Sequence, residues 1–149
     1  MRYLLDTGIL LRLLNREADL HDVIRRTIRK LKQENHECVT TPQNLCEFWN
    51  VCTRPESSRG GLGLTFEEAH RRLRTIERIA TVLCDLPATG ERWKQLIVQH
   101  KVHGVQVHDT RLVALMDLHG VTRLLTLNPA DFHRFPHIVS VTPEDLLSQ

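Results

Sequence analysis

Short apolar stretches alternate with longer amphipathic segments along the whole chain. The apolar stretches are rich in Leu, Val, Ile, Cys and Thr, and they are Arg2 to Leu5, Cys38 to Thr40, Thr81 to Cys84, Arg123 to Thr126 and Ile138 to Val141. Each is the length of a short buried strand. Because strands separated by helices are typical of parallel sheets, the pattern predicts a three-layer α/β/α sandwich with a mainly parallel sheet.

The segments between these strands show helical spacing and helix start signals. Leu20, Val23, Ile24, Thr27, Ile28 and Leu31 share one predicted helical face. Thr41 and Pro42 begin another helix, and Thr65 to Glu68 forms a capping box. The remaining predicted helices are a short one ending at Leu14, one containing Trp93 to His100, one from Gln106 to Leu118 that ends near Gly120, and a terminal one that starts at Thr142 and Pro143.

Two of these helices have predicted core faces. The helix that starts at Pro42 is expected to bury Leu45, Phe48, Trp49 and Cys52. The helix after the capping box is expected to bury Ala69, Leu73, Ile76 and Ala80. The only segment rich in helix and strand breakers, Arg54 to Gly63, is too short to link two domains. We therefore predict one domain over residues 1–149.

Composition narrows the cellular setting. No apolar run approaches the roughly 20 residues of a membrane-spanning helix, and Asp6, Thr7 and Gly8 interrupt the first apolar segment, which is atypical of a signal peptide. The four cysteines form no C-x-x-C pair, so we expect reduced, mostly buried thiols rather than a zinc site. These features together predict a cytoplasmic protein.

Charge gives weaker information about partners. The net charge of +2 is too small to indicate nucleic acid by itself. Basic residues gather in two segments, Arg25 to Lys32 and Arg71 to Arg78. Runs of this kind are most often the solvated face of a helix, and the alternative is a track for phosphate groups.

Polar residues follow the first and fourth predicted strands. Asp6 comes directly after the first strand, and Asn128 and Asp131 come shortly after the fourth. In parallel sheets ligands bind outside the carboxyl ends of the strands. Each residue also has a purely structural interpretation, because Asp and Asn are common in turns and at helix N-caps.

Two further acids lie on predicted helices. Glu47 shares a mostly polar face with Gln43, Asn44 and Asn50, opposite the aromatic core face. Asp109 lies near the start of the helix that begins at Gln106, where it could simply complement the helix dipole. Alone, Glu47 would be interpreted as an ordinary exposed glutamate, although a polar stripe beside an aromatic core face suggests a lined cleft. For Asp109 the functional alternative directs its carboxylate toward the carboxyl ends of the strands.

Four segments in order resemble a known family, the PIN domains, and especially the VapC-type toxin ribonucleases. The segments are L-L-D-T near the N-terminus, N-L-C-E-F-W-N-V, V-H-D-T-R-L-V-A-L and L-L-T-L-N-P-A-D-F, and they extend over nearly the whole chain. In that family these places hold the acidic cluster. The resemblance therefore implies Asp6, Glu47 and Asp109 as catalytic and metal-ligating residues, with Asn128 or Asp131 completing the set.

Many family members have aspartate at the position of Asn128, and this chain departs from them there. Thr126 corresponds to the hydroxyl residue beside the site. We expect Thr7, Asn44, Thr126 and Asn128 to line the site, where they either contact substrate or support the carboxylates. Converging carboxylates repel one another unless a cation is present, and their oxygen atoms suit Mg²⁺ or Mn²⁺.

The resemblance implies endonucleolytic cleavage of RNA by a metal-activated water. It also implies a homodimer and a protein antitoxin as the partner of a type II toxin. The departure at Asn128 leaves a second interpretation open, in which the fold binds RNA or protein and has weak or no nuclease activity. Metal-dependent cleavage that disappears when Asp6, Glu47 and Asp109 are changed discriminates between the two.

Overall fold

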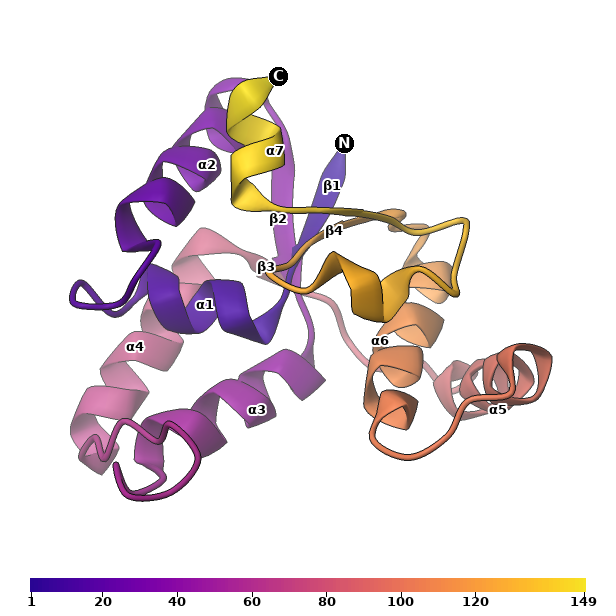
Figure 1. The fold of residues 1–149 in the computed structure, drawn as a ribbon, viewed down its shortest axis with the longest axis horizontal. Helices are drawn as coiled ribbons and strands as arrows, with labels where there is room; N and C mark the ends of the chain where they lie inside the picture. The colour runs from indigo at the N-terminus through magenta and orange to yellow at the C-terminus, as the bar shows by residue number, and fades with distance from the viewer.

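Five parallel strands form one sheet, and seven helices cover it (Figure 1). The computed structural model describes all residues from 1 to 149. The elements are β1 (Arg2–Leu5), α1 (Thr7–Leu13), α2 (His21–Gln33), β2 (Glu37–Thr40), α3 (Pro42–Thr53), α4 (Phe66–Ile79), β3 (Thr81–Val82), α5 (Thr89–His100), α6 (Gln106–His119), β4 (Arg123–Leu125), the 3-10 turn η1 (Pro129–Phe132), β5 (Val139–Val141) and α7 (Pro143–Ser148).

The strands lie in the order β3-β2-β1-β4-β5, so β1 is central. Its neighbours pair with it in parallel, with Leu4 opposite Val39 on one side and Leu124 on the other. The carboxyl ends of β1, β2 and β4 therefore meet at one edge of the sheet. This confirms the three-layer α/β/α prediction, with a sheet that is entirely rather than mainly parallel.

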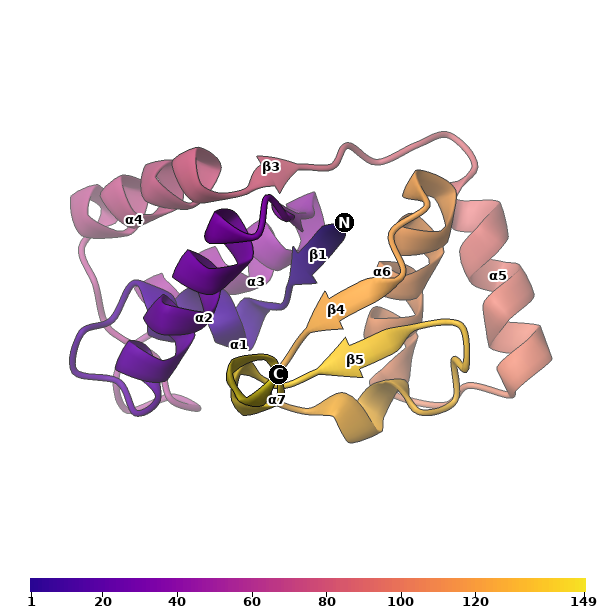
Figure 2. The same ribbon diagram turned by 90° about the horizontal axis from the view of Figure 1, so that it is seen from above.

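Alternate residues of β1 face the two helical layers. Tyr3 and Leu5 pack with the core formed by α1, α2, α3, α4 and α7, whereas Leu4 packs with the core of α5 and α6. Figure 2 shows the two helical layers on opposite sides of the strands. No helix combines the length and apolar character that crossing a bilayer requires. The sheet edge that carries the polar residues thus lies between α3 on one side and α6 on the other.

Start signals at helix N-termini behave as predicted. Thr41 caps α3 by accepting a hydrogen bond from the Asn44 amide, and Pro42 occupies the first turn. Thr65 and Glu68 form the reciprocal capping box of α4. Gly120 ends α6 with a φ of 63°, a left-handed conformation that glycine adopts without a steric penalty.

Three details differ from the predictions. Strand β3 ends at Val82 rather than Cys84, because the chain leaves the sheet after Leu83 donates one more backbone bond to Thr40. On α3, Leu45 and Trp49 are only half-buried, and Asn44 takes a core position instead, because the first turn of α3 lies against α1. Cys38 and Cys52 are buried, but Cys46 and Cys84 are exposed, so only two of the four thiols lie in the interior.

Candidate active site

Asp6 lies at the carboxyl end of the central strand. Its backbone amide donates to the Leu125 carbonyl at 3.0 Å, which ties the end of β1 to the end of β4. One carboxylate oxygen accepts from the Thr7 amide at 2.8 Å and caps α1, and the other accepts from Thr126 Oγ1 at 2.7 Å. Asp6 is therefore a helix cap, and its second oxygen is held by a residue that follows β4.

Thr7 joins Glu47 to the buried part of the site. Its hydroxyl donates to Glu47 Oε2 at 2.7 Å and accepts from Asn44 Nδ2 at 3.1 Å. Asn44 is buried, and its own oxygen accepts from Thr41 Oγ1 at 2.7 Å. These hydrogen bonds form a continuous series from Thr41 through Asn44 and Thr7 to Glu47. The position of Glu47 is therefore linked to the start of both α1 and α3.

Asp109 lies in the first turn of α6 and is half-buried. Burial, and after it the negative charges of Asp6, Asp131 and Glu47, together raise the pKa of Asp109 to about 6. Burial also raises the pKa of Asp6, although the hydrogen bond from Thr126 opposes this, and Glu47 and Asp131 add to the increase. The four carboxylates are therefore close enough to repel one another.

The predicted residues around the carboxylates fall into two groups. Thr7, Asn44 and Thr126 are all buried and hydrogen-bonded within the site. Asn128 takes part only through its backbone amide, which donates to Thr126 Oγ1 at 3.1 Å, and its side chain is exposed. Of the two candidates after β4, Asp131 is the one whose charge acts on Asp6 and Asp109.

The donor set suits a hard cation that keeps part of its water shell. No three His, Cys, Asp or Glu side chains are grouped tightly enough to bind a metal ion directly as a cage. None of the four carboxylates forms an ion pair with Lys, Arg or His either. Mg²⁺ is typically held by one or two carboxylates and several waters. An uncompensated cluster of carboxylate oxygens fits that mode of binding.

The acidic residues lie outside the main hollows of the surface. These hollows, with volumes of about 190 to 650 Å³, are lined by other residues.

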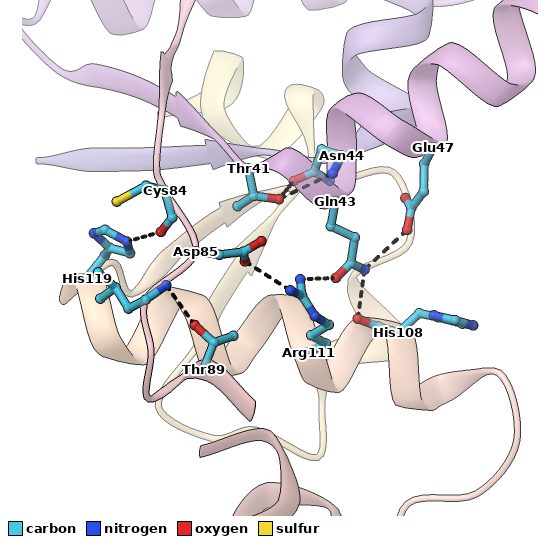
Figure 3. Close-up of polar contacts among 11 residues, drawn as sticks. Thr41, Gln43, Asn44, Glu47, Cys84, Asp85, Thr89, His108, Arg111 and His119 are labelled. Carbon is cyan, nitrogen blue, oxygen red and sulfur yellow. Dashed lines mark hydrogen bonds and ion pairs between the residues drawn. The ribbon is translucent and has the colours of Figure 1, made fainter. Parts of the chain in front are cut away.

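Sequence reasoning missed part of the polar network beside Glu47. Gln43 donates to Glu47 and is itself held by Arg111, which also binds Asp85 (Figure 3). The spacing of four residues between Gln43 and Glu47 could have indicated their bond. Asp85 follows β3, so the rule used for Asp6 could have placed it at the same edge. The sequence carried no signal for Arg111.

The comparison with protein families resolves what kind of domain this is. Residues 3–138 match the PIN domain. The chain belongs to the PIN domain family. A comparison with curated proteins finds no relative that matches the sequence.

Solved structures of this PIN domain's fold come from several bacteria. A chain of VapBC2 from Rickettsia felis, bound to a DNA fragment from its promoter, has a TM-score of 0.72 at 15% identity and covers 95% of this chain and 98% of its own. VapBC-1 from nontypeable Haemophilus influenzae has a TM-score of 0.69 at 18% identity, and the match covers 97% of this chain and 99% of the VapBC-1 chain. Mycobacterium tuberculosis VapC20, described as a toxin that cleaves the sarcin–ricin loop, has a TM-score of 0.56 at 18% identity, with 82% and 86% covered.

Proposed function

We propose that this PIN domain is a Mg²⁺- or Mn²⁺-dependent endoribonuclease and the toxin of a type II toxin–antitoxin pair. The observation that supports the proposal most strongly is the cluster of four carboxylates near the carboxyl ends of the strands. It has no ion pair, and burial and mutual repulsion raise the pKa values of Asp6 and Asp109. A fold does not fix an activity, so the proposal depends on this site.

Three of the four carboxylates are proposed to bind the cation directly or through water. Asp6 and Asp109 bind the cation directly, Asp6 being held in place by Thr126 and by the Thr7 amide. Glu47 binds it directly or through water, and Thr7 fixes one of its oxygens. When bound, the cation supplies the Lewis acid that activates water and neutralises charge on the scissile phosphate. Hydrolysis then adds water across a P–O bond of the RNA backbone.

Cleavage of RNA with and without cation tests this proposal. Asp6→Asn, Glu47→Gln and Asp109→Asn should each lower cleavage of a broad RNA panel by about 10²-fold or more, because each removes charge that acts on the reacting phosphate. Glu77→Gln is a matched control, since Glu77 is exposed on α4. Cleavage that persists in excess chelator would refute the metal-dependent mechanism, and absence of cleavage with either cation would favour the alternative of an RNA- or protein-binding domain.

We further infer that Asp131, rather than Asn128, is the fourth acidic residue. The inference rests on charge alone: Asp131 and Asn128 are both exposed and neither side chain forms a hydrogen bond, but only Asp131 carries a carboxylate, and its charge raises the pKa of both Asp6 and Asp109. Asp131→Asn should weaken Mn²⁺ binding, measured by calorimetry, and Asn128→Ala should leave it unchanged. The opposite result would assign the fourth position to Asn128.

A homodimer and an antitoxin complete the proposal. Two copies related by a two-fold axis would extend the surface available to an RNA segment by repeating one interface. Several of the similar folds come from the VapBC and FitAB assemblies. An antitoxin tail with Arg could occupy the place of the cation, because a guanidinium pairs with two carboxylate oxygens. The four free thiols agree with action in the reducing cytoplasm.

Two experiments test these partners. Light scattering at micromolar concentration should give twice the mass of the 17.3 kDa chain, and a strict monomer would contradict the dimer. Expression of the toxin alone should slow growth, and co-expression with the adjacent gene should restore it. Growth that is unaffected by the chain alone would contradict the toxin assignment.

A further inference from the structure

Arg111 connects three segments beside the acidic site. From α6 its Nη1 donates to Gln43 Oε1 on α3 at 3.3 Å, and its Nη2 donates to Asp85 Oδ1 after β3 at 3.0 Å. Figure 3 shows the guanidinium between these two acceptors. Because Asp85 forms the ion pair with Arg111, the guanidinium does not serve as the counter-charge of Glu47.

Gln43 forms hydrogen bonds with both Arg111 and Glu47 and so connects the two side chains. Its Nε2 donates to Glu47 Oε1 at 3.2 Å and to the His108 carbonyl at 2.9 Å. Arg has only donors, and the Glu47 carboxylate and the His108 carbonyl have only acceptors. The amide of Gln43 therefore satisfies all three partners in a single orientation, with its oxygen toward Arg111 and its NH₂ group toward Glu47.

Both oxygens of Glu47 are held before any ligand binds. Gln43 holds Oε1, and Thr7 Oγ1 donates to Oε2 at 2.7 Å. A glutamate on a helix surface otherwise samples several rotamers, and that freedom must be lost when it binds a cation. A carboxylate fixed in advance avoids most of this loss, which raises affinity.

We propose that Gln43 and Arg111 are positioning residues that hold Glu47 ready for the divalent cation, with Arg111 acting only through Gln43. The inference rests on the proposed function, since the position of Glu47 matters only if the acidic site binds a cation. It differs from a role for Arg111 in contacting the phosphates of RNA, which would act on RNA affinity and would not require Gln43.

The test is the affinity for Mn²⁺ alone, measured by calorimetry on RNA-free protein. Gln43→Met keeps the length of the side chain and removes its hydrogen bonds, and it should weaken Mn²⁺ binding about 10-fold, the usual effect of removing a partner of a metal-binding side chain. Arg111→Met should weaken binding to a similar or smaller extent. Gln99→Met and Arg16→Met, at exposed positions, should leave the affinity unchanged.

The double variant provides the sharper result. If Arg111 acts only through Gln43, Gln43→Met/Arg111→Met should bind Mn²⁺ no more weakly than Gln43→Met alone. If the losses of Mn²⁺ affinity in the two single variants multiply in the double variant, Arg111 does not act through Gln43 and the proposal is overturned. Cleavage by Gln43→Met should also recover when the Mn²⁺ concentration is raised about tenfold, which damage to the fold would not allow.

The remaining outcomes separate this inference from the proposed function. Wild-type affinity in Gln43→Met would overturn the inference and leave the nuclease proposal standing. Absence of Mn²⁺ binding in the wild-type protein would overturn both. Weaker RNA binding by Arg111→Met at unchanged Mn²⁺ affinity would make Arg111 a phosphate contact. If Arg111→Met unfolds, Arg111→Gln replaces it, since it keeps a polar side chain but removes the guanidinium and should lower Mn²⁺ affinity as Arg111→Met would.

Discussion

Helix α6 carries an aspartate near each end, and the two aspartates lie in opposite electrostatic surroundings. Near the C-terminus of the helix, Asp117 accepts from Arg92 Nε and Nη2 at 2.8 and 2.7 Å and bonds to His137 Nε2 at 2.8 Å. Near the N-terminus, Asp109 has no ion pair, and the charges that act on it most strongly come from other acids.

The helix dipole alone would favour the reverse arrangement. It stabilises a carboxylate in the first turn, where Asp109 lies, and destabilises one in the last turn, where Asp117 lies. The fold nevertheless supplies an arginine and a histidine to Asp117 and carboxylates to Asp109. The comparison indicates that Asp117 contributes to folding, whereas the surroundings of Asp109 lower the stability of the folded state.

The largest expected effect on stability concerns Asp117. Asp117→Asn should lower the free energy of unfolding by about 1–3 kcal/mol, because it weakens the hydrogen bonds of a side chain that is only 14% exposed and leaves the Arg92 charge without its counter-charge. Urea unfolding measures the change. Asp22→Asn is the control, since Asp22 is 83% exposed and lies 3.8 Å from Arg25, and it should change stability by less than about 0.5 kcal/mol.

An Asp→Asn substitution at the other end of α6 should have the opposite effect on the free energy of unfolding. Asp109→Asn should raise the free energy of unfolding by about 1 kcal/mol at pH 7 without divalent cation, because it removes a half-buried charge repelled by Asp6, Asp131 and Glu47. A loss of stability comparable to that of Asp117→Asn would remove the contrast between the two ends.

The pH dependence of this gain follows from the raised pKa. Asp109 titrates at about 6 in the folded protein and near 4 in an unfolded chain. The folded state therefore binds this proton more tightly, and the stability that the proton provides is complete below about pH 4 and lost as pH rises through about 6. The advantage of Asp109→Asn over wild type should be greatest above pH 6 and should disappear below about pH 4 in urea unfolding.

The smallest effect on stability is expected on a third region, the basic face of α4. Arg71, Arg74 and Arg78 are exposed and form no ion pair, so replacing all three by Gln should change stability by less than about 0.5 kcal/mol. If this face follows an RNA backbone, the slope of log K against log salt should become shallower by about 2. An unchanged slope would mean that these residues are simply solvated.

The predictions from sequence succeeded where local signals are sufficient. The caps at Thr41 and Thr65 and the apolar face of α2 depend on residues close in sequence, so their pattern can be recognised without knowing the fold. The end of β3 was wrong because it depends on where the chain leaves its neighbour β2. Local pattern also could not show that Asn44 lies in the core against Thr7.

The site was predicted less completely than the fold. Asp6, Glu47 and Asp109 were proposed from the family resemblance, and their roles stay predictions. The network of Gln43, Asp85 and Arg111 joins α3, the segment after β3 and α6, and its members are 26 to 68 residues apart in sequence. The rule for residues that follow parallel strands could have placed Asp85 near the site, but one sequence contains no signal that joins Arg111 to Gln43 and Asp85, so only the structure shows that contact.

The outer strands of the sheet are among its shortest elements. Strand β3 has two residues and β5 has three, whereas the central strand β1 and its neighbour β2 each have four and the inner strand β4 has three. An exposed sheet edge can recruit strands from other molecules, and the risk increases with the number of unpaired backbone groups. Short edges at both sides leave little template for such pairing. The lengths of β3 and β5 thus limit the number of backbone groups through which another molecule could extend this parallel sheet.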